Sequence, residues 1–202
     1  MTPIIYLASN SPRRRELLQQ IRVSYEVLAF RGPARHDHDI CEDTLPGEDA
    51  VSYVKRVALL KAEGGVRRIE WRGLPRRLLL AADTTLELDG EVIGKPRDGE
   101  HAVQILRELS GRTHQVLTAV VLTDGERYLQ RLSTNQVRFR PLKDAEIHQY
   151  VASGEATDKA GAYGIQGRAA VFIEEIRGSY TGIMGLPLFE TAALLQEFGY
   201  PL

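Results

Sequence analysis

The sequence is poor in cysteine and in long apolar runs, and it carries almost no net charge. Its single cysteine, Cys41, cannot form an internal disulfide, which fits a reducing compartment and predicts a cytoplasmic protein. No run approaches the roughly 20 apolar residues of a membrane-spanning helix, and no charged segment precedes a long apolar one at the start, so we expect neither membrane insertion nor export. The 26 basic and 27 acidic residues give a formal net charge of −1, which leaves no overall field that favours nucleic acid. Any binding of phosphate must therefore depend on a local cluster of residues.

The order of apolar runs and turn signals predicts a mixed α/β fold. The 202 residues are enough for one domain, 1–202, built as one unit or as two lobes around a cleft. Expected strands cover 4–8, 78–82, 86–88, 91–93, 115–122, 130–139 and 171–176. Expected helices begin at Pro12 and cover 46–63, 101–109, 144–152 and 187–198.

Turn residues sharpen this prediction at two places. Asp89-Gly90 lies between two apolar segments and is a strong hairpin signal. Gly64-Gly65 is expected to end the second helix, and 66–77 then forms a solvated basic connection. Antiparallel hairpins between helices favour a mixed sheet over a purely parallel one.

A basic, hydroxyl-rich turn follows the first predicted strand. Ser11 is a suitable N-cap, which places Arg13, Arg14 and Arg15 in the first helical turn. Positive side chains oppose the helix dipole at this end, so an anion is expected there. Free backbone N–H groups, the hydroxyl of Ser9 and a guanidinium group suit phosphate, although a solvated basic turn is the alternative.

A carboxylate and a lysine flank the predicted hairpin. Asp83 follows an apolar strand, where ligands gather at the crevice of α/β sheets, and a carboxylate there needs a partner or a metal. With Asp89-Gly90 as the turn, Thr84 falls opposite Lys95, and Asp83 and Lys95 become diagonal neighbours. Strict pleating points these two side chains to opposite faces, so joint action on a ligand requires an irregular strand end. A surface salt bridge is the alternative.

The third segment is rich in glycine. Gly161, Gly164 and Gly167 recur every three residues, without the lysine of a Walker loop or the strand context of a dinucleotide fingerprint. Glycine lets a backbone approach a ligand, Tyr163 can stack on or cover a base, and Gln166 offers the donor and acceptor that suit the edge of a pyrimidine ring. A glycine-rich turn is the alternative.

Residues 36–39 are a weaker candidate for a metal site. His36 and His38 stand beside Asp37 and Asp39, which resembles a metal cluster. The flanking glycine and proline favour a hydrophilic loop instead.

Together these segments resemble the Maf nucleotide pyrophosphatase family. The motifs are Leu7-Ala8-Ser9-Asn10-Ser11-Pro12-Arg13-Arg14, Ala82-Asp83-Thr84, Gly94-Lys95-Pro96 and Lys159-Ala160-Gly161-Ala162-Tyr163-Gly164-Ile165-Gln166-Gly167. The resemblance spans nearly the whole chain. It implies a cytoplasmic enzyme that uses a divalent metal, Mg²⁺ or Mn²⁺, to hydrolyse nucleoside triphosphates to monophosphate and pyrophosphate. It also implies homodimers and an elongated α/β fold, shared with inosine triphosphate pyrophosphatases, in which helices flank a mixed sheet with a central cleft.

The resemblance assigns roles to individual positions. Asp83 matches the catalytic proton acceptor of the family, and together with Glu42 it is expected to hold the metal. Positions tied to base specificity are Arg13, Thr84 and Gln166. Positions that handle phosphate or metal are Ser9, Arg14, Glu42, Lys61 and Lys95.

The residue at position 166 bears on the choice of nucleotide. The branch that acts on dTTP and UTP has Gln at this position of the glycine loop, as here, whereas the 7-methyl-GTP branch has an acidic residue. We therefore expect hydrolysis of dTTP and UTP, with removal of non-standard nucleotides as the housekeeping role. The alternatives are a hydrolase of 7-methyl-GTP or deaminated purine triphosphates, and a nucleotide-binding regulator of cell division. Relatives often carry an acidic pair where this chain has Cys41-Glu42, which leaves one carboxylate.

Overall fold

A computed structural model of the chain describes residues 3–28 and 42–202. Predictions that concern Cys41 and the stretch 30–39, including His36 and His38, lie outside the described residues.

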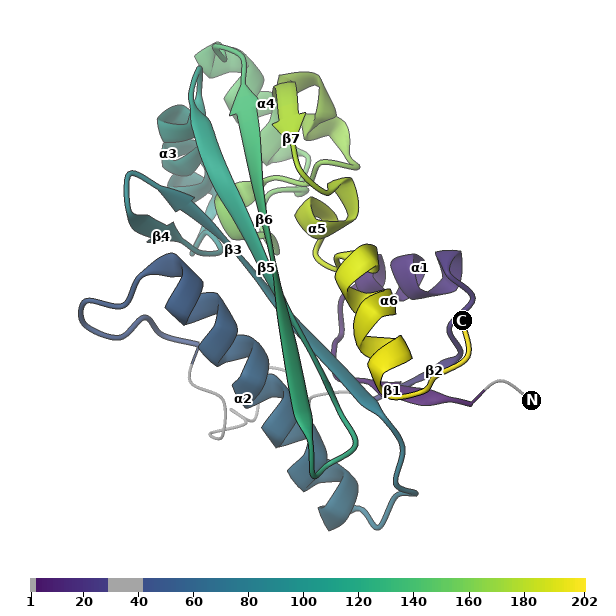
Figure 1. Ribbon diagram of the computed structural model, residues 1–202. Coiled ribbons are helices and arrows are strands. Elements are labelled where there is room, and N and C mark those ends of the chain that lie inside the picture. Colours follow the sequence, from purple (N-terminus) through teal and green to yellow (C-terminus); the bar gives the residue numbers. More distant parts are fainter. Residues whose placement is uncertain (1–2, 29–41) are drawn as a thin grey trace.

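One mixed sheet runs through the described part of the chain (Figure 1). Its strands are β1 (Ile5–Leu7), β2 (Tyr25–Val27), β3 (Leu79–Leu88), β4 (Glu91–Ile93), β5 (Thr113–Thr123), β6 (Tyr128–Phe139) and β7 (Ile173–Arg177). The order is β2-β1-β3-β5-β6-β7, with β4 paired to β3. β1 is parallel to β2 and β3, and the other described pairs are antiparallel. The predicted mixed sheet with antiparallel hairpins is confirmed.

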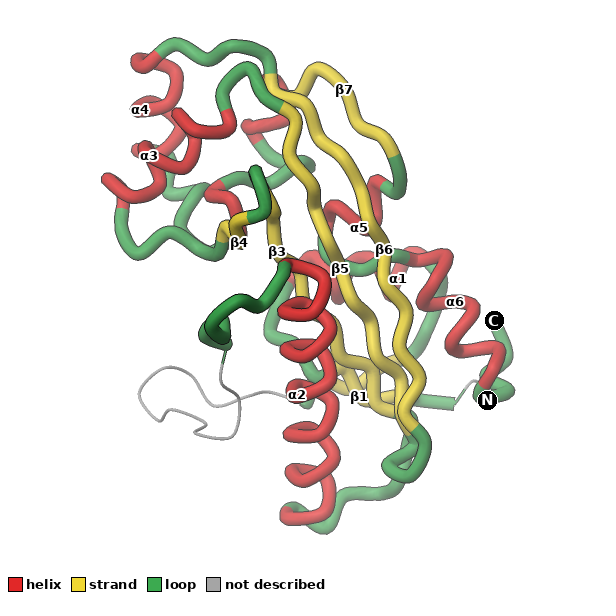
Figure 2. The backbone as a smooth tube through the Cα atoms, turned by 60° about the vertical axis from the view of Figure 1, so that its left-hand side comes forward, coloured by secondary structure: helices red, strands yellow, loops and turns green. Residues whose placement is uncertain are grey.

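Helices cover both faces of this sheet (Figure 2). They are α1 (Pro12–Gln20), α2 (Ala50–Trp71), α3 (Gly99–Leu109), α4 (Asp144–Ala152), α5 (Tyr180–Met184) and α6 (Leu188–Glu197), with short 3-10 turns at Ala160–Ala162 and Arg168–Phe172. Helix α2 packs on β3 and β5 from one side, and α1, α5 and α6 lie on the other. The helices predicted at Pro12, 101–109, 144–152 and 187–198 are thus confirmed within a residue or two, whereas the strand predicted at 171–176 begins only at Ile173.

The alternation of side chains along β3 explains this layering. Leu79 and Ala81 pack under α2, whereas Leu80 and Ala82 face α1 and α6. A strand with both faces buried has a continuous apolar sequence, as residues 78–82 do here. A third apolar core lies where α3 and α4 pack beside the far ends of the long strands, which gives the molecule its elongated form (Figures 1 and 2).

Helix α2 does not end at Gly64-Gly65, and the prediction that 66–77 is a connection is wrong for its first half. A Cβ atom on Gly65 would lie 2.6 Å from Cδ1 of Leu79. Glycine costs about 1 kcal/mol in a helix interior, and here it lets the helix approach the sheet closely. The helix therefore continues to Trp71, which is exposed.

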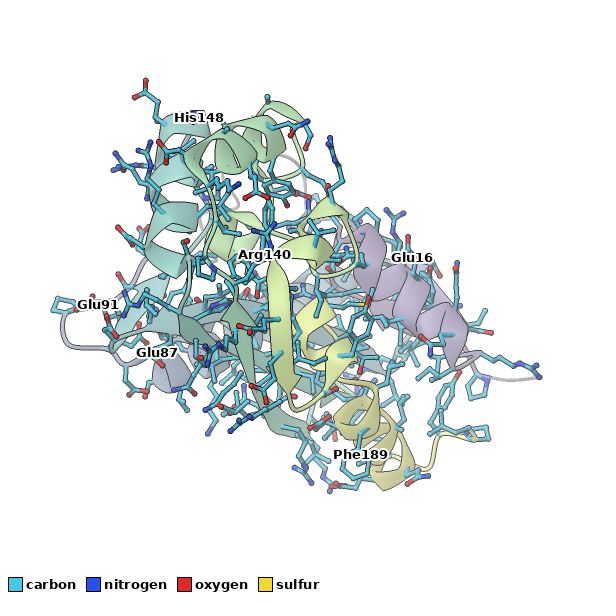
Figure 3. The ribbon with its side chains drawn as sticks, turned by 90° about the horizontal axis from the view of Figure 1, so that it is seen from above. Glu16, Glu87, Glu91, Arg140, His148 and Phe189 are labelled. Carbon is cyan, nitrogen blue, oxygen red and sulfur yellow. The ribbon has the colours of Figure 1, made fainter. Side chains whose placement is uncertain are left out.

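The hairpin predicted at Asp89-Gly90 is confirmed. Leu88 pairs with Glu91, and both turn residues have positive φ, 55° and 86°, as a two-residue turn of this kind requires. Seen from above, this turn lies on the opposite side of the molecule from helix α1, as Glu91 and Glu16 show (Figure 3). Phe189 of α6 is exposed.

Candidate active site

A gap along one edge of β3 creates the site. On this edge β1 pairs with Leu79 and Leu80, and β4 pairs with the segment from Leu86 onward. Between them, the backbone at Asp83 and Thr84 pairs only with β5 among the described strands. Because this edge is open, side chains from both faces of the sheet reach one space. Strand β4 ends at Ile93, so Lys95 lies beyond the ladder, which is the irregular strand end that joint action of Asp83 and Lys95 requires.

The gap leads into a cavity of about 470 Å³. A volume of this size suits a small ligand such as a nucleotide. Every residue predicted for the site lines this cavity: Ser9, Arg13, Arg14, Glu42, Lys61, Asp83, Thr84, Lys95 and Gln166. Segments that are far apart in the sequence therefore contribute to one site.

Lys61 of α2 binds both predicted acidic residues. Its Nζ atom lies 2.7 Å from Oδ1 of Asp83 and 2.9 Å from Oε1 of Glu42. The side chains of Lys61 and Asp83 are only 15% and 11% exposed, so water screens their interaction weakly. The cation bound to Asp83 is therefore Lys61 and not its predicted neighbour Lys95. The β3–β4 ladder ends at Leu86 and does not reach Lys95, which lines the cavity from the loop after β4.

The charges in this cluster hold Glu42 in its ionised form. Burial raises the pKa of the Glu42 carboxyl, but the charge and hydrogen bond of Lys61, with the charges of Lys95 and Arg14, outweigh burial and lower the pKa overall. The hydroxyl of Tyr53 donates to the backbone oxygen of Glu42 at 2.9 Å. Burial and the nearby charge of Asp83 raise the pKa of Tyr53 to about 12, so this hydroxyl keeps its proton at neutral pH.

Arg14 joins helix α1 to three other parts of the site. Its guanidinium donates to Oγ of Ser9 at 3.2 Å, to Oγ1 of Thr84 at 3.3 Å and to the backbone oxygen of Gly185 at 2.7 Å. These contacts compete with the predicted binding of phosphate, because they already occupy several of its five N–H groups. Burial lowers the pKa of Arg14, whereas the charge of Asp83 acts in the opposite direction.

The three arginines of the first helical turn have different surroundings. Arg13 lines the cavity beside Asp158, with 3.8 Å between Nη1 and Oδ2. Arg14 is held as described above, and Arg15 is absent from the lining within the described ranges. Ser11 caps the helix as predicted, because its side chain accepts from the backbone nitrogen of Arg14.

The glycine loop borders the opposite wall. The backbone nitrogen of Gly161 donates to the oxygen of Gly94 at 3.0 Å, which ties this loop to the segment of Lys95. Gln166 is exposed and lines the cavity. Tyr163 lines the cavity as well, but its ring is largely buried against His114 and Phe139, which holds it in place.

The acidic residues suit a magnesium-type ion. No group of three or more His, Cys, Asp and Glu residues is placed to hold a metal within 3–28 and 42–202. Asp83 and Glu42 nevertheless pair with one ammonium group, so the two carboxylates lie close together. Mg²⁺ commonly binds one or two carboxylates and takes its other ligands from substrate phosphates and water. The residues present fit this pattern.

Two residues of the site were missed in the sequence. Lys159 lines the cavity, and its Nζ atom donates to the oxygen of Glu155 and to Oδ1 of Asp158, both at 2.6 Å. Thr118 lies behind Thr84 on β5, with 3.0 Å between the hydroxyl oxygens. Its signal in the sequence was a lone polar residue in the apolar run 116–122.

Comparisons with known proteins show the family to which the chain belongs. A family model described as "Maf-like protein" matches residues 4–198. The dTTP/UTP pyrophosphatase of Aromatoleum aromaticum is 66% identical and is covered, like this chain, over 100% of its length. That of Chromobacterium violaceum is 55% identical over 98% of this chain and 96% of its own. The structure of the Staphylococcus aureus Ham1 protein matches 67% of this chain and 71% of its own with 19% identity and a TM-score of 0.43. In the part of the chain that the structure describes, no helix has the length and apolar character to cross a membrane.

Proposed function

The chain belongs to the Maf-like protein family, and from this premise we propose that it hydrolyses dTTP and UTP to the nucleoside monophosphate and pyrophosphate. The observation that carries the proposal is the convergence of Asp83, Glu42 and Lys61 in the same cavity as Thr84 and Gln166. The carboxylates can hold a metal-bound triphosphate, the lysines and Arg13 can offset its charge, and the neutral polar side chains of Thr84 and Gln166 suit the edge of a base.

The carboxylate of Asp83 is the proposed proton acceptor. It takes a proton from the water that attacks the α-phosphorus, and the bond to the bridging oxygen breaks so that pyrophosphate leaves. Lys61 holds Oδ1 of Asp83 at 2.7 Å and fixes the orientation of the carboxylate. Lys95 and Arg13 line the cavity and offset the negative charge that develops on the leaving oxygens. Lys159, with three donors on its ammonium group, adds to the same positive surface.

A divalent cation, Mg²⁺ or Mn²⁺, is the proposed cofactor. Asp83 and Glu42 would hold it, and when bound it would polarise the phosphate oxygens and acidify water. Glu42 remains available for this role at neutral pH because its pKa is lowered.

The neutral polar side chains of Gln166 and Thr84 are proposed to recognise the base. Gln166 can both donate and accept, as the mixed edge of uracil or thymine requires. Thr84 lies on β3 next to Asp83, so one strand positions both the proposed proton acceptor and a proposed contact to the base. A base that cannot match these groups leaves them unpaired, which lowers the rate for the wrong nucleotide.

Release of pyrophosphate from dTTP, UTP, CTP, GTP and 7-methyl-GTP with Mg²⁺ or Mn²⁺ tests the proposal. We expect metal-dependent turnover of dTTP and UTP, and loss of most turnover in Asp83→Asn with nucleotide binding retained. The control is Glu91→Gln, which removes an exposed carboxylate at the β3–β4 turn (Figure 3). Near-wild-type turnover of Asp83→Asn sinks the catalytic assignment, and preferred turnover of 7-methyl-GTP sinks the substrate assignment.

Three broader proposals rest on the resemblance to the family. We propose that 1–202 acts as one catalytic domain, that the protein works in the cytoplasm on the nucleotide pool, and that it assembles as a homodimer. Light scattering of the purified protein, cell fractionation and activity of the whole chain test them.

A further inference from the structure

A chain of hydrogen bonds runs from Arg14 through two threonines to helix α5. Nη2 of Arg14 donates to Oγ1 of Thr84 at 3.3 Å, and Oγ1 of Thr84 lies 3.0 Å from Oγ1 of Thr118. Oγ1 of Thr118 donates to the backbone oxygen of Gly182 at 2.8 Å. We call these four residues the threonine chain.

The two ends of the threonine chain fix the direction of its hydrogens. A guanidinium group only donates and a carbonyl oxygen only accepts. Thr118 therefore uses its single hydroxyl hydrogen on Gly182, and the hydrogen between the two threonines comes from Thr84. With that hydrogen committed, Thr84 can only accept a hydrogen bond from a ligand in the cavity.

The surroundings of Thr118 prevent this arrangement from relaxing. Thr118 is fully buried, and it is the direct cross-strand partner of Thr84 in the β3–β5 ladder. A Cβ atom on Gly182 would lie 2.6 Å from Oγ of Ser133, so a glycine is needed for α5 to bring its carbonyl this close to the sheet. The buried hydroxyl of Thr118 has no access to water as an alternative partner, and its bond to Gly182 is costly to break.

We propose that Thr118 is a positioning residue that sets base specificity, although it does not itself contact the ligand. It holds the hydroxyl of Thr84 as a pure acceptor, and this favours a base that presents an N–H group. Uracil and thymine carry a hydrogen on N3, whereas N3 of cytosine carries a lone pair and repels a second acceptor. The inference rests on the proposed hydrolysis of dTTP and UTP, and it explains how Thr84 discriminates against CTP.

The variant Thr118→Val tests the inference. It removes the hydroxyl with little change in shape and frees the hydrogen of Thr84 to point into the cavity. We expect the ratio of kcat/KM for UTP to that for CTP to fall about tenfold, as expected for the loss of one hydrogen-bond preference. A lower KM for CTP should accompany this change, whereas a purely structural defect would lower kcat/KM for both nucleotides together.

Two further variants separate an effect on the orientation of the Thr84 hydroxyl from an effect on the stability of the fold. Thr118→Ser keeps the hydroxyl and should keep the wild-type ratio. Thr123→Val is the matched control, because Thr123 is a buried threonine of the same strand whose hydroxyl accepts from the backbone nitrogen of Gly125 at 2.9 Å. It should lower the melting temperature and leave the ratio unchanged.

The outcomes are distinguishable. If Thr118→Val does not fold, Thr118→Ala removes the same hydroxyl and is measured instead. Wild-type protein that turns over no UTP overturns the proposed function. Wild-type turnover of UTP with an unchanged UTP-to-CTP ratio in Thr118→Val or Thr118→Ala overturns this inference alone, and so does an equal fall of the ratio in Thr118→Ser.

Discussion

Nζ of Lys61 lies 2.7 Å from Oδ1 of Asp83, and this ion pair joins helix α2 to strand β3 beside the open edge of the sheet. The same nitrogen binds Glu42, so one cation sets the electrostatics of both proposed metal-binding carboxylates. Removing the cation should therefore change the acid–base behaviour of the site as well as its rate.

We predict that Lys61→Gln lowers kcat/KM for UTP by at least about tenfold. Because the charge of Lys61 lowers the pKa of Glu42, its loss should raise that pKa. The fall in activity on the acid side of the pH profile should then begin at a higher pH than in the wild-type protein. The measurement is kcat/KM between pH 4 and pH 8.

Lys55→Gln is the matched control for this experiment. Lys55 lies on the same helix and its side chain is exposed. The rate and the pH profile of the control should match those of the wild type. An acid limb that does not move in Lys61→Gln would show that the charge of Lys61 does not reach Glu42.

Gln166→Glu should weaken the use of dTTP and UTP selectively. A carboxylate accepts but cannot donate, so one contact to the pyrimidine edge is lost and an acceptor faces an acceptor. We expect kcat/KM for both nucleotides to fall by about tenfold or more, with smaller changes for purine nucleotides. The control is Gln104→Glu on an exposed position of α3. An equal loss for every nucleotide would assign Gln166 a structural role instead.

The sequence predicts which residues line the site better than it predicts which of them pair with one another. Every predicted residue lines the cavity because the motifs carry chemistry that a core does not need. The hairpin at Asp89-Gly90 was also predictable, because few residues other than glycine and Asn or Asp tolerate its positive φ.

The pairing of charges depends on tertiary packing, which local patterns do not contain. Lys61 meets Asp83 because Gly65 lets α2 lie close on the sheet, and the two glycines looked instead like a helix end. Likewise, Arg14 donates to Gly185, which is 171 positions away in the sequence, and no spacing rule connects them. Nothing local in the sequence shows that His114 binds the hydroxyl of Tyr163.

The packing of the glycine loop leads to a prediction about Gly161. Its φ is +71°, and an added Cβ atom would lie 2.1 Å from Cδ2 of Leu86. Gly161→Ala therefore combines backbone strain with a steric clash, and we expect it to cost about 2 kcal/mol or more in free energy of unfolding. Because Gly161 is bound to Gly94, displacement of the loop should also raise the KM for UTP.

Gly154→Ala separates the two contributions in the Gly161 variant. Gly154 has a similar φ of +79° but has no atom within 4 Å of the added Cβ. It therefore reports the backbone strain alone, roughly 1 kcal/mol. Urea unfolding of both variants gives the comparison. Equal losses of stability would mean that Leu86 moves away without cost and that the contact is unimportant.

The buried His114 predicts a specific dependence of stability on pH. Burial lowers the pKa of its imidazole from 6.5 to about 4, and Nε2 binds the hydroxyl of Tyr163 at 2.8 Å. Between these two pKa values the unfolded chain binds a proton that the folded protein does not, so the free energy of unfolding falls as the pH falls from 6.5 toward 4. The contribution of this one group at pH 5 is about 2 kcal/mol.

His114→Gln should remove this contribution while keeping a polar partner for Tyr163. We expect the variant to have a lower free energy of unfolding than the wild type at pH 7. Between pH 7 and pH 5, its free energy of unfolding should fall by about 2 kcal/mol less than that of the wild type, as measured by urea unfolding. His148→Gln, at an exposed position of α4 (Figure 3), should follow the wild-type pH dependence. If wild type and His114→Gln lose the same stability over this interval, the imidazole is protonated in the folded protein and its environment is more polar than the structure shows.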